Sequence, residues 1–569
     1  MKASDYIAWA LEQHGVTCVF EMSGGMITHI LDSLNRQGTV PVISVHHEQA
    51  AAFAADAAGR MTGIPGVAMA TSGPGATNLL TGIGSCHFDS SPGVFITGQV
   101  NLHEQKGDRA IRQLGFQETD IVAMAEPITK QAWRVKTAAE LPAILNEAFR
   151  VAVEGRPGPV LIDVPMDLQR AQVEAVPPLP KRLTEAPESE TFFENLAAAL
   201  RTARRPLILA GGGVGASRTS SELVAFAEAT GVPVVCSLMG LDTIPFEHPL
   251  RIGFIGSYGN RWANLALGEA DLLIVLGSRL DIRQTGNDTD AFKSNREIFH
   301  VDCEPGEINN RLSGCQGLVS ELPDFFRAAT GRLPHGVFAD WRNRLQALEQ
   351  EWPDTAELKD LPGINPNVFM RELSVSGAQV AAYVVDVGQH QMWAAQSLHL
   401  QAGQRFLTSG GMGSMGFALP AAIGASLCRP GQPVVMIAGD GAFQANIQEL
   451  QTVVRNRLPL KMVIINNQCH GMVRQFQENY FDARYQSTLW GYSAPDFEKI
   501  AGAYGIAGYT VHQPEDVAEG LRKLWQDPLA PGLLQVMVDT YANAYPKIAF
   551  GRPMTEMEPF FKSVAMEST

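Results

Sequence analysis

Two polar motifs in the last third of the chain have the residue types and spacing of a metal site. Gly439-Asp440-Gly441 follows the apolar run Val434–Ala438, and Asn466-Asn467 follows the run Lys461–Ile465. Neighbouring parallel strands end at the same edge of a sheet, so we expect Asp440 and Asn467 to lie side by side there. One carboxylate, one amide oxygen and a nearby backbone carbonyl suit Mg²⁺, and backbone N–H groups of Gly441 and Ala442 would face a phosphate. The alternative is a turn aspartate and a helix-capping asparagine.

A second glycine-rich motif lies in the middle of the chain. The segment Gly211–Ala216 (GGGVGA) follows the strand-like run Pro206–Leu209 and matches the spacing of a dinucleotide-binding turn. Such a turn is followed about 20 residues later by an acidic residue at the end of the next strand, where this chain has Val232–Cys236. Taken alone, the motif is a weak indication of a nucleotide site.

Strand-like apolar runs alternate with helical patterns along the whole chain, which is typical of parallel sheets covered by helices. The proline-rich stretch Val176–Glu190 and the charged stretch Pro334–Asn365 separate three blocks. This division agrees with a domain size of roughly 100–200 residues. We therefore predict an α/β fold with three domains at residues 1–175, 191–331 and 366–550, the middle one Rossmann-like.

The predicted strands are the most apolar runs of each block. The glycine-rich segments Thr71–Thr77 and Thr408–Ser414 both precede small-residue helices, which suggests that the outer two domains arose by duplication; the alternative is a chance match of two short segments. The strands are Val16–Phe20, Val42–Val45, Gly66–Ala70, Gly93–Thr97 and Pro159–Asp163; Pro206–Ala210, Pro233–Cys236, Asp271–Leu276 and Glu297–Val301; and Ala381–Val385, Val434–Ala438, Lys461–Ile465 and Gly532–Val538.

The composition of the 569 residues narrows the functional class. The net charge of −15 argues against a nucleic acid partner, although it leaves room for a local pocket that binds a small phosphate. No stretch of about 18 apolar residues predicts a membrane helix. The start of the chain has no secretory pattern, so we expect a cytoplasmic protein by default. The seven cysteines form no CxxC pair, which fits a reducing compartment.

The GDG and NN motifs, 24 residues apart, resemble the cofactor signature of thiamine diphosphate (ThDP) enzymes. Nearly the whole chain is similar to the catalytic subunit of acetohydroxyacid synthase, also named acetolactate synthase. The matching segments are His47-Glu48-Gln49, Thr71–Asn78, Thr97–Val100, Gly115–Glu118, Gly155–Pro159, Gly388–Trp393, Thr408–Ala425 and Gly471–Glu478.

This resemblance implies roles for residues of the first and third domains. Glu48 would hydrogen-bond the aminopyrimidine ring of ThDP and share the proton that generates the nucleophile; alternatively, it is a glutamate favoured by the helix macrodipole. Asp440, Asn467 and the backbone carbonyl of Cys469 would bind Mg²⁺. The other residues expected at ThDP are Gly388, Gln389, His390, Gly413, Met415, Gly439, Gly441, Ala442, Met472 and Val473.

The resemblance also explains the middle glycine motif as part of an FAD site. Arg279 would face the adenine or the phosphates, and Asp302 a ribose hydroxyl or the adenine amine. In this family FAD shapes the site and is not a redox partner in the main reaction. The alternative is a domain that keeps the fold without FAD. The residues expected at FAD are Gly212, Gly213, Ser237, Leu238, Met239, Gly256, Gly277, Arg279, Asp281 and Asp302.

Several positions depart from the family pattern on the side of the second substrate. Met166 stands where a lysine is usual, Phe476 where a tryptophan is usual, and Ile282 where an aspartate is usual. The stretch Glu104–Arg112 carries Lys106, Arg109 and Arg112, which form either a solvated loop or a contact for a phosphate of a bulky substrate. We expect Gln117 and Arg283 among the catalytic residues, and Phe116, Met166 and Phe476 in the substrate pocket.

We therefore expect a ThDP-dependent carboligase that decarboxylates pyruvate and transfers the two-carbon unit to an acceptor ketone. The departures suggest an altered second substrate, so this acceptor would be a 2-keto acid or a larger ketone such as a nucleotide-linked keto-sugar. The alternatives are acetolactate synthase with pyruvate as acceptor, a simple 2-keto acid decarboxylase, and a ThDP-binding subunit without turnover. The family builds each site between two subunits, which implies a homodimer or homotetramer, with no nucleic acid or membrane partner.

Overall fold

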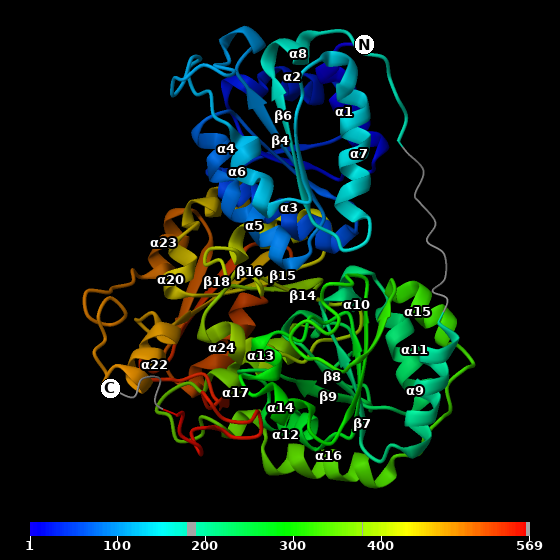
Figure 1. Ribbon diagram of the computed structural model, residues 1–569. Helices are drawn as coiled ribbons and strands as arrows, with labels where there is room; N and C mark the ends of the chain where they lie inside the picture. The colour runs from blue at the N-terminus through cyan, green and yellow to red at the C-terminus, as the bar shows by residue number, and fades with distance from the viewer. Residues whose placement is uncertain (179–188, 378, 565–569) are drawn as a thin grey trace.

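Three six-stranded parallel sheets run through the computed structural model, which describes residues 1–178, 189–377 and 379–564 (Figure 1). The expected α/β fold with three parallel-sheet domains is confirmed. The proposed linker Val176–Glu190 lies largely outside the described residues, at 179–188. Among the described residues, no helix combines the length and hydropathy needed to cross a membrane.

The first and third sheets share one topology. Their strand orders are β2-β1-β3-β4-β6-β5 and β14-β13-β15-β16-β18-β17, which are the same order when each sheet is numbered from its own first strand. The first contains β1 (Val19–Met22), β2 (Val42–Ser44), β3 (Gly66–Ala70), β4 (Gly93–Gln99), β5 (Gln131–Arg134) and β6 (Pro159–Pro165). The third contains β13 (Ala382–Val385), β14 (Arg405–Thr408), β15 (Val434–Gly439), β16 (Leu460–Asn466), β17 (Ala507–Val511) and β18 (Gly532–Met537). The shared order supports the duplication that the glycine-rich segments suggested.

The middle sheet has the strand order of a dinucleotide-binding fold. Its order, β12-β11-β10-β7-β8-β9, is 3-2-1-4-5-6 when read from the other edge and numbered within the sheet. Its strands are β7 (Pro206–Ala210), β8 (Val234–Cys236), β9 (Arg251–Phe254), β10 (Leu272–Leu276), β11 (Glu297–Asp302) and β12 (Gln316–Val319). Two further short strands, β19 (Lys547–Ile548) and β20 (Met557–Glu558), pair antiparallel near the C-terminus.

Helices connect and cover the sheets. In the first domain they are α1 (Ala3–Gln13), α2 (Thr28–Gln37), α3 (Glu48–Thr62), α4 (Pro74–Asn78), α5 (Leu80–Asp89), α6 (Ile121–Ala125), α7 (Leu141–Val153) and α8 (Met166–Arg170). In the second they are α9 (Glu190–Thr202), α10 (Gly212–Ala216), α11 (Ser220–Thr230), α12 (Arg261–Glu269), α13 (Ile282–Thr285), α14 (Thr289–Lys293), α15 (Leu322–Ala329) and α16 (Ala339–Glu351). In the third they are α17 (Pro366–Ser376), α18 (Gln389–Ser397), α19 (Ala418–Leu427), α20 (Asp440–Gln444), α21 (Leu450–Arg455), α22 (Gly471–Tyr480), α23 (Phe497–Ala503) and α24 (Pro514–Leu524).

Two helices made of small residues join the first and third domains. Helix α3 is rich in alanine and packs against α19, whose residues are almost all buried. A Cβ atom on Gly424 would lie 2.1 Å from the backbone oxygen of Ala54, so only glycine permits this approach. The contact holds α3, whose first residue is Glu48, against the domain that carries Asp440.

The strand orders also predict where ligands bind. In open α/β sheets, ligands bind at the carboxyl ends of the strands, where the order reverses from one side to the other. That point lies between β7 and β10 in the middle sheet and between β13 and β15 in the third. The loops that leave these four strands begin at Gly211, Gly277, Asp386 and Asp440, next to the predicted cofactor residues.

Candidate active site

One cavity of about 960 Å³ is lined by all three domains. It brings together every residue predicted at FAD, every residue predicted at ThDP except Glu48, the three predicted metal ligands, and Arg283. From the third domain these are Gly388, Gln389, His390, Gly413, Met415, Gly439, Asp440, Gly441, Ala442, Asn467, Cys469, Met472 and Val473; from the middle domain they are Gly212, Gly213, Ser237, Leu238, Met239, Gly256, Gly277, Arg279, Asp281, Arg283 and Asp302.

Asp440 and Asn467 follow adjacent parallel strands, as the sequence predicts. Gly439 of β15 is paired with Ile465 of β16, so the loops of the two strands leave the sheet side by side. Both side chains are buried, and the Tyr492 hydroxyl donates a hydrogen bond to Asp440 Oδ2 at 3.0 Å. Within the described part of the chain, no cluster of three or more His, Cys, Asp or Glu side chains forms a metal site. The carboxylate of Asp440 and the amide oxygen of Asn467 are the kinds of donor that a hard cation with few protein ligands prefers.

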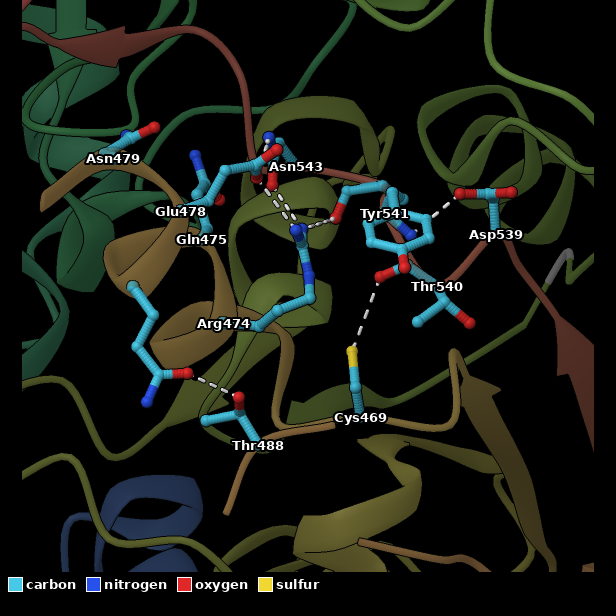
Figure 2. Close-up of polar contacts among 12 residues, drawn as sticks. Cys469, Arg474, Gln475, Glu478, Asn479, Thr488, Asp539, Thr540, Tyr541 and Asn543 are labelled. Atoms are coloured by element: carbon cyan, nitrogen blue, oxygen red, sulfur yellow. Dashed lines mark hydrogen bonds and ion pairs between the residues drawn. The ribbon is translucent and has the colours of Figure 1, made fainter. Parts of the chain in front are cut away.

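The thiol of Cys469 is turned to a different partner. Cys469 Sγ donates to the Thr540 carbonyl at 3.5 Å, a contact drawn in Figure 2, and burial raises the pKa of the thiol to about 11. A metal ligand would need the thiolate. This fits the expectation that only the backbone carbonyl of Cys469 faces the metal.

His390 fills the space between two glycine turns at the start of α18. A Cβ on Gly388 or Gly439 would lie 2.7 Å or 2.9 Å from the His390 ring, so both positions require glycine. Burial lowers the pKa of His390 to about 3, and Nε2 accepts a hydrogen bond from the Gly439 N–H at 3.2 Å. The ring is therefore neutral at pH 7 and locks the loop after β13 to the loop after β15.

The glycine turns of the middle domain leave room for a nucleotide. A Cβ on Gly213 would lie 2.8 Å from Gly277 Cα, so the turns after β7 and β10 meet backbone to backbone. Arg279 reaches Asp281 Oδ2 at 3.3 Å and remains partly exposed in the cavity. Asp281 also caps α13, because its Oδ1 accepts from the Arg283 N–H at 2.9 Å. A cation beside two close glycine turns fits a diphosphate of a dinucleotide.

Four predicted residues of the first domain do not line this cavity: Glu48, Phe116, Gln117 and Met166. Glu48 is buried at the first position of α3, and Asn78 Nδ2 donates to its Oε2 at 3.0 Å. Gln117 has a φ of +66°, a conformation that costs a non-glycine residue energy and often marks functional sites. Phe116 is 80% exposed. Met166 begins α8. None of the four therefore lines the cavity that contains Asp440 of the same chain.

Phe476 lies on α22 and lines a smaller cavity of about 450 Å³ together with Val473. Its ring contacts those of Tyr480 and Phe481, and its side chain is 40% exposed. Because Val473 lines both cavities, the predicted pocket residue Phe476 adjoins the predicted ThDP residues without sharing their cavity.

Comparisons with known proteins agree with this geometry. Models of the thiamine pyrophosphate enzyme N-terminal, central and C-terminal domains match residues 1–124, 193–328 and 386–531. Acetolactate synthase isozyme 2 large subunit of Escherichia coli is 38% identical over 98% of this chain and 99% of its own length. The acetolactate synthase large subunit of Cyanidium caldarium is 37% identical over 96% of this chain and 95% of its own. The chain belongs to the acetolactate synthase large-subunit family of thiamine pyrophosphate enzymes.

Membership of the acetolactate synthase family confirms the resemblance seen in the sequence, and with it a ThDP-dependent enzyme. Tyr492, Asn78 and Gln475 contact predicted site residues but were not predicted to do so. Asn78 and Gln475 lie in segments that match the family, so the sequence could have indicated both residues. Tyr492 is outside all of them and lies 52 residues from Asp440, so nothing in the sequence pointed to it.

Proposed function

We propose that this member of the acetolactate synthase family joins two molecules of pyruvate into acetolactate with loss of CO₂. The identity of 38% across 98% of the chain to a relative named acetolactate synthase carries this proposal. The buried pair Asp440 and Asn467 at the expected strand edge supports it. A larger keto-sugar acceptor has less support, because Lys106, Arg109 and Arg112 do not line either cavity.

The protein would hold three cofactors. Asp440, Asn467 and the Cys469 carbonyl would bind Mg²⁺; the loops at Gly388–His390 and Gly439–Ala442, with Gly413, Met415, Met472 and Val473, would hold ThDP. FAD would lie along Gly212–Gly213, Ser237–Met239, Gly256, Gly277, Arg279, Asp281 and Asp302. All of these residues line one cavity, and its volume of about 960 Å³ is in the range of small-molecule and cofactor sites.

When bound, ThDP would supply a nucleophilic carbon for the keto group and a cationic ring as the sink for the electron pair left by CO₂. The protein's own contribution is to hold protons and exclude water. Glu48, buried and oriented by Asn78, would hold a proton at a ring nitrogen of the cofactor. Gln117 and Arg283 would position the acceptor, with Phe116, Met166 and Phe476 as walls of its pocket.

Glu48 and Asp440 would act in the same active site only if that site is formed by residues of two subunits. Within one chain, Glu48 does not line the cavity that contains Asp440. A partner subunit that brings its own Glu48, Phe116, Gln117 and Met166 to this cavity would complete the site. The strongly exposed Phe116 would then be covered. We infer at least a homodimer.

Supplying competing acceptors tests the choice of pyruvate. With ¹³C-pyruvate, ThDP, Mg²⁺ and FAD, we expect label in acetolactate, and an added nucleotide-linked keto-sugar should not divert it. NMR of the products checks this. Label in a branched sugar, together with no acetolactate from pyruvate alone, would show that the keto-sugar and not pyruvate is the acceptor.

Asp440 gives the Mg²⁺ affinity an expected pH dependence. Burial raises the pKa of Asp440 to about 6, and Mg²⁺ binds the carboxylate form. Affinity is therefore present above this pKa and falls below it, by about tenfold for each further pH unit. Calorimetry in the presence of ThDP measures this. Equal dissociation constants at pH 5 and pH 7.5 would contradict the assignment, and Asp440→Asn should remove the dependence.

Arg279 is expected to hold FAD. The purified protein should be yellow, and Arg279→Met should weaken FAD binding by about tenfold or more, because a charge-assisted contact is worth about 1.5–3 kcal/mol. Absorbance near the flavin band after gel filtration measures the retained cofactor. Arg344→Met is the matched control, because Arg344 pairs with Glu269 and does not line the cavity. A colourless wild-type protein that does not take up FAD would favour a domain that keeps only the fold.

A further inference from the structure

Three buried side-chain amides form a continuous hydrogen-bonded chain that ends at the metal edge. Asn467 Nδ2 donates to Gln389 Oε1 at 3.1 Å, and Gln389 Nε2 donates to Gln475 Oε1 at 3.1 Å. Gln475 then pairs with the backbone of Ala544: its Oε1 accepts from the N–H at 2.9 Å and its Nε2 donates to the carbonyl at 3.1 Å. The three side chains are between 1% and 6% exposed, so water does not replace these bonds.

The backbone of Ala544 determines the direction of every amide in this chain. A side-chain amide can rotate and exchange its oxygen and nitrogen, but a backbone N–H and carbonyl cannot. Ala544 therefore fixes the orientation of Gln475, which fixes Gln389, which fixes Asn467. The result is that Asn467 Nδ2 points to Gln389, and from the residues that the structure describes Oδ1 accepts only one long contact, from the Cys469 N–H at 3.3 Å. A free lone pair remains on the oxygen predicted to bind Mg²⁺.

Gly471, the first residue of α22, makes space for this chain of amides. A Cβ at this position would lie 1.9 Å from Gln389 Oε1 and 2.6 Å from Asn467 Nδ2. Any side chain would break the contact between the two amides. The glycine that opens α22 therefore serves the amide chain as well as the helix.

We propose that Gln475 is a positioning residue for the metal site, acting through Gln389 to present the Asn467 oxygen to Mg²⁺. The proposal rests on the Mg²⁺ site of the proposed function. Gln475 itself does not line the cavity that contains Asp440 and Asn467. Through these hydrogen bonds Gln475 also connects the predicted metal site to α22, which carries Met472, Val473 and Phe476.

Figure 2 shows that the neighbouring Arg474 joins α22 to the same C-terminal segment by separate contacts. Its guanidinium donates to Glu478 Oε2 at 2.8 Å, to the Ala542 carbonyl at 3.2 Å and to Asn543 Oδ1. None of these bonds involves Gln475, Gln389 or Asn467. The structure thus offers a matched control, since Asn543→Ala loosens the segment without touching the amide chain.

The test is Mg²⁺ titration of the full-length protein with ThDP present, followed by calorimetry or tryptophan fluorescence. Gln475→Met should raise the dissociation constant for Mg²⁺ by about 10–100-fold, the usual effect of losing a residue that orients a metal ligand. Asn543→Ala should leave it unchanged. Gln475→Glu is the second variant in case the methionine variant does not fold. It keeps the acceptors but sets an oxygen against the Ala544 carbonyl, and should also weaken Mg²⁺.

Combining variants separates the amide chain from independent effects. The effects of Gln389→Met and Gln475→Met on the dissociation constant for Mg²⁺ should not multiply in the double variant, because either change interrupts the same chain of amides. Unchanged Mg²⁺ affinity in both Gln475 variants, or an equal loss in Asn543→Ala, would overturn the proposal. A wild-type protein that binds Mg²⁺ but forms no acetolactate would refute the proposed function alone. A wild-type protein that binds no Mg²⁺ would overturn both the metal site and the role of Gln475.

Discussion

Replacing Glu48 by glutamine is expected to reduce turnover of pyruvate about 10²–10⁴-fold, the usual contribution of a positioned acid or base. Glutamine has nearly the same shape, and its Oε1 can still accept the hydrogen bond from Asn78 Nδ2 that the structure shows. What it cannot do is hold or share a proton at the cofactor ring. The loss should therefore appear in kcat, with little change in the thermal unfolding temperature.

The control for this variant is another glutamate in the first turn of a helix. Glu222 occupies the first turn of α11, is exposed, and has the same favourable relation to the helix macrodipole. Glu222→Gln should leave turnover unchanged. If Glu48→Gln retained most of the wild-type kcat, Glu48 would be a structural helix-end glutamate and the proton-holding role would be wrong.

A mixture of two inactive subunits is expected to regain activity. Glu48→Gln and Asp440→Ala each remove one half of a site that we infer to be shared between subunits. A mixed dimer, purified through two different tags, would contain one intact site and one site with both changes. It should show about half of the wild-type activity, because the two interfaces of a symmetric dimer are equivalent.

The matched mixture combines Asp440→Ala with Asn467→Ala. Both changes fall on the same half of the site, so every site of that mixed dimer carries a change and no activity should return. If the Glu48→Gln and Asp440→Ala mixture were equally inactive, the two residues would belong to one subunit's site or to no common site.

The central strands of all three sheets could be predicted from apolar runs. Gly66–Ala70 and Pro206–Ala210 were predicted with the bounds that the structure gives. In the three six-stranded sheets, the strands that were not predicted all lie at the edges: β5, β9, β12, β14 and β17. An edge strand has one side without a neighbouring strand, so polar and apolar residues occur together along it. In β12, for example, Gln316, Gly317 and Val319 are at least partly exposed, and no apolar run marks the strand.

The candidate site could be predicted where its residues are close in sequence to a strand end. Asp440 and Asn467 each follow a central strand, so the parallel register alone places them together. Tyr492 and Ala544 reach the same region from segments with no regular pattern, and only the folded chain brings them there. The separation of Glu48 from the cavity likewise depends on how two domains pack, which strand patterns do not determine.

The most direct test of the proposed acetolactate synthesis is the ratio of pyruvate consumed to CO₂ released, with pyruvate as the sole substrate and ThDP, Mg²⁺ and FAD present. We predict two molecules of pyruvate for each CO₂, with acetolactate as the product. One pyruvate for each CO₂ with acetaldehyde as product, or no consumption at all, would contradict it.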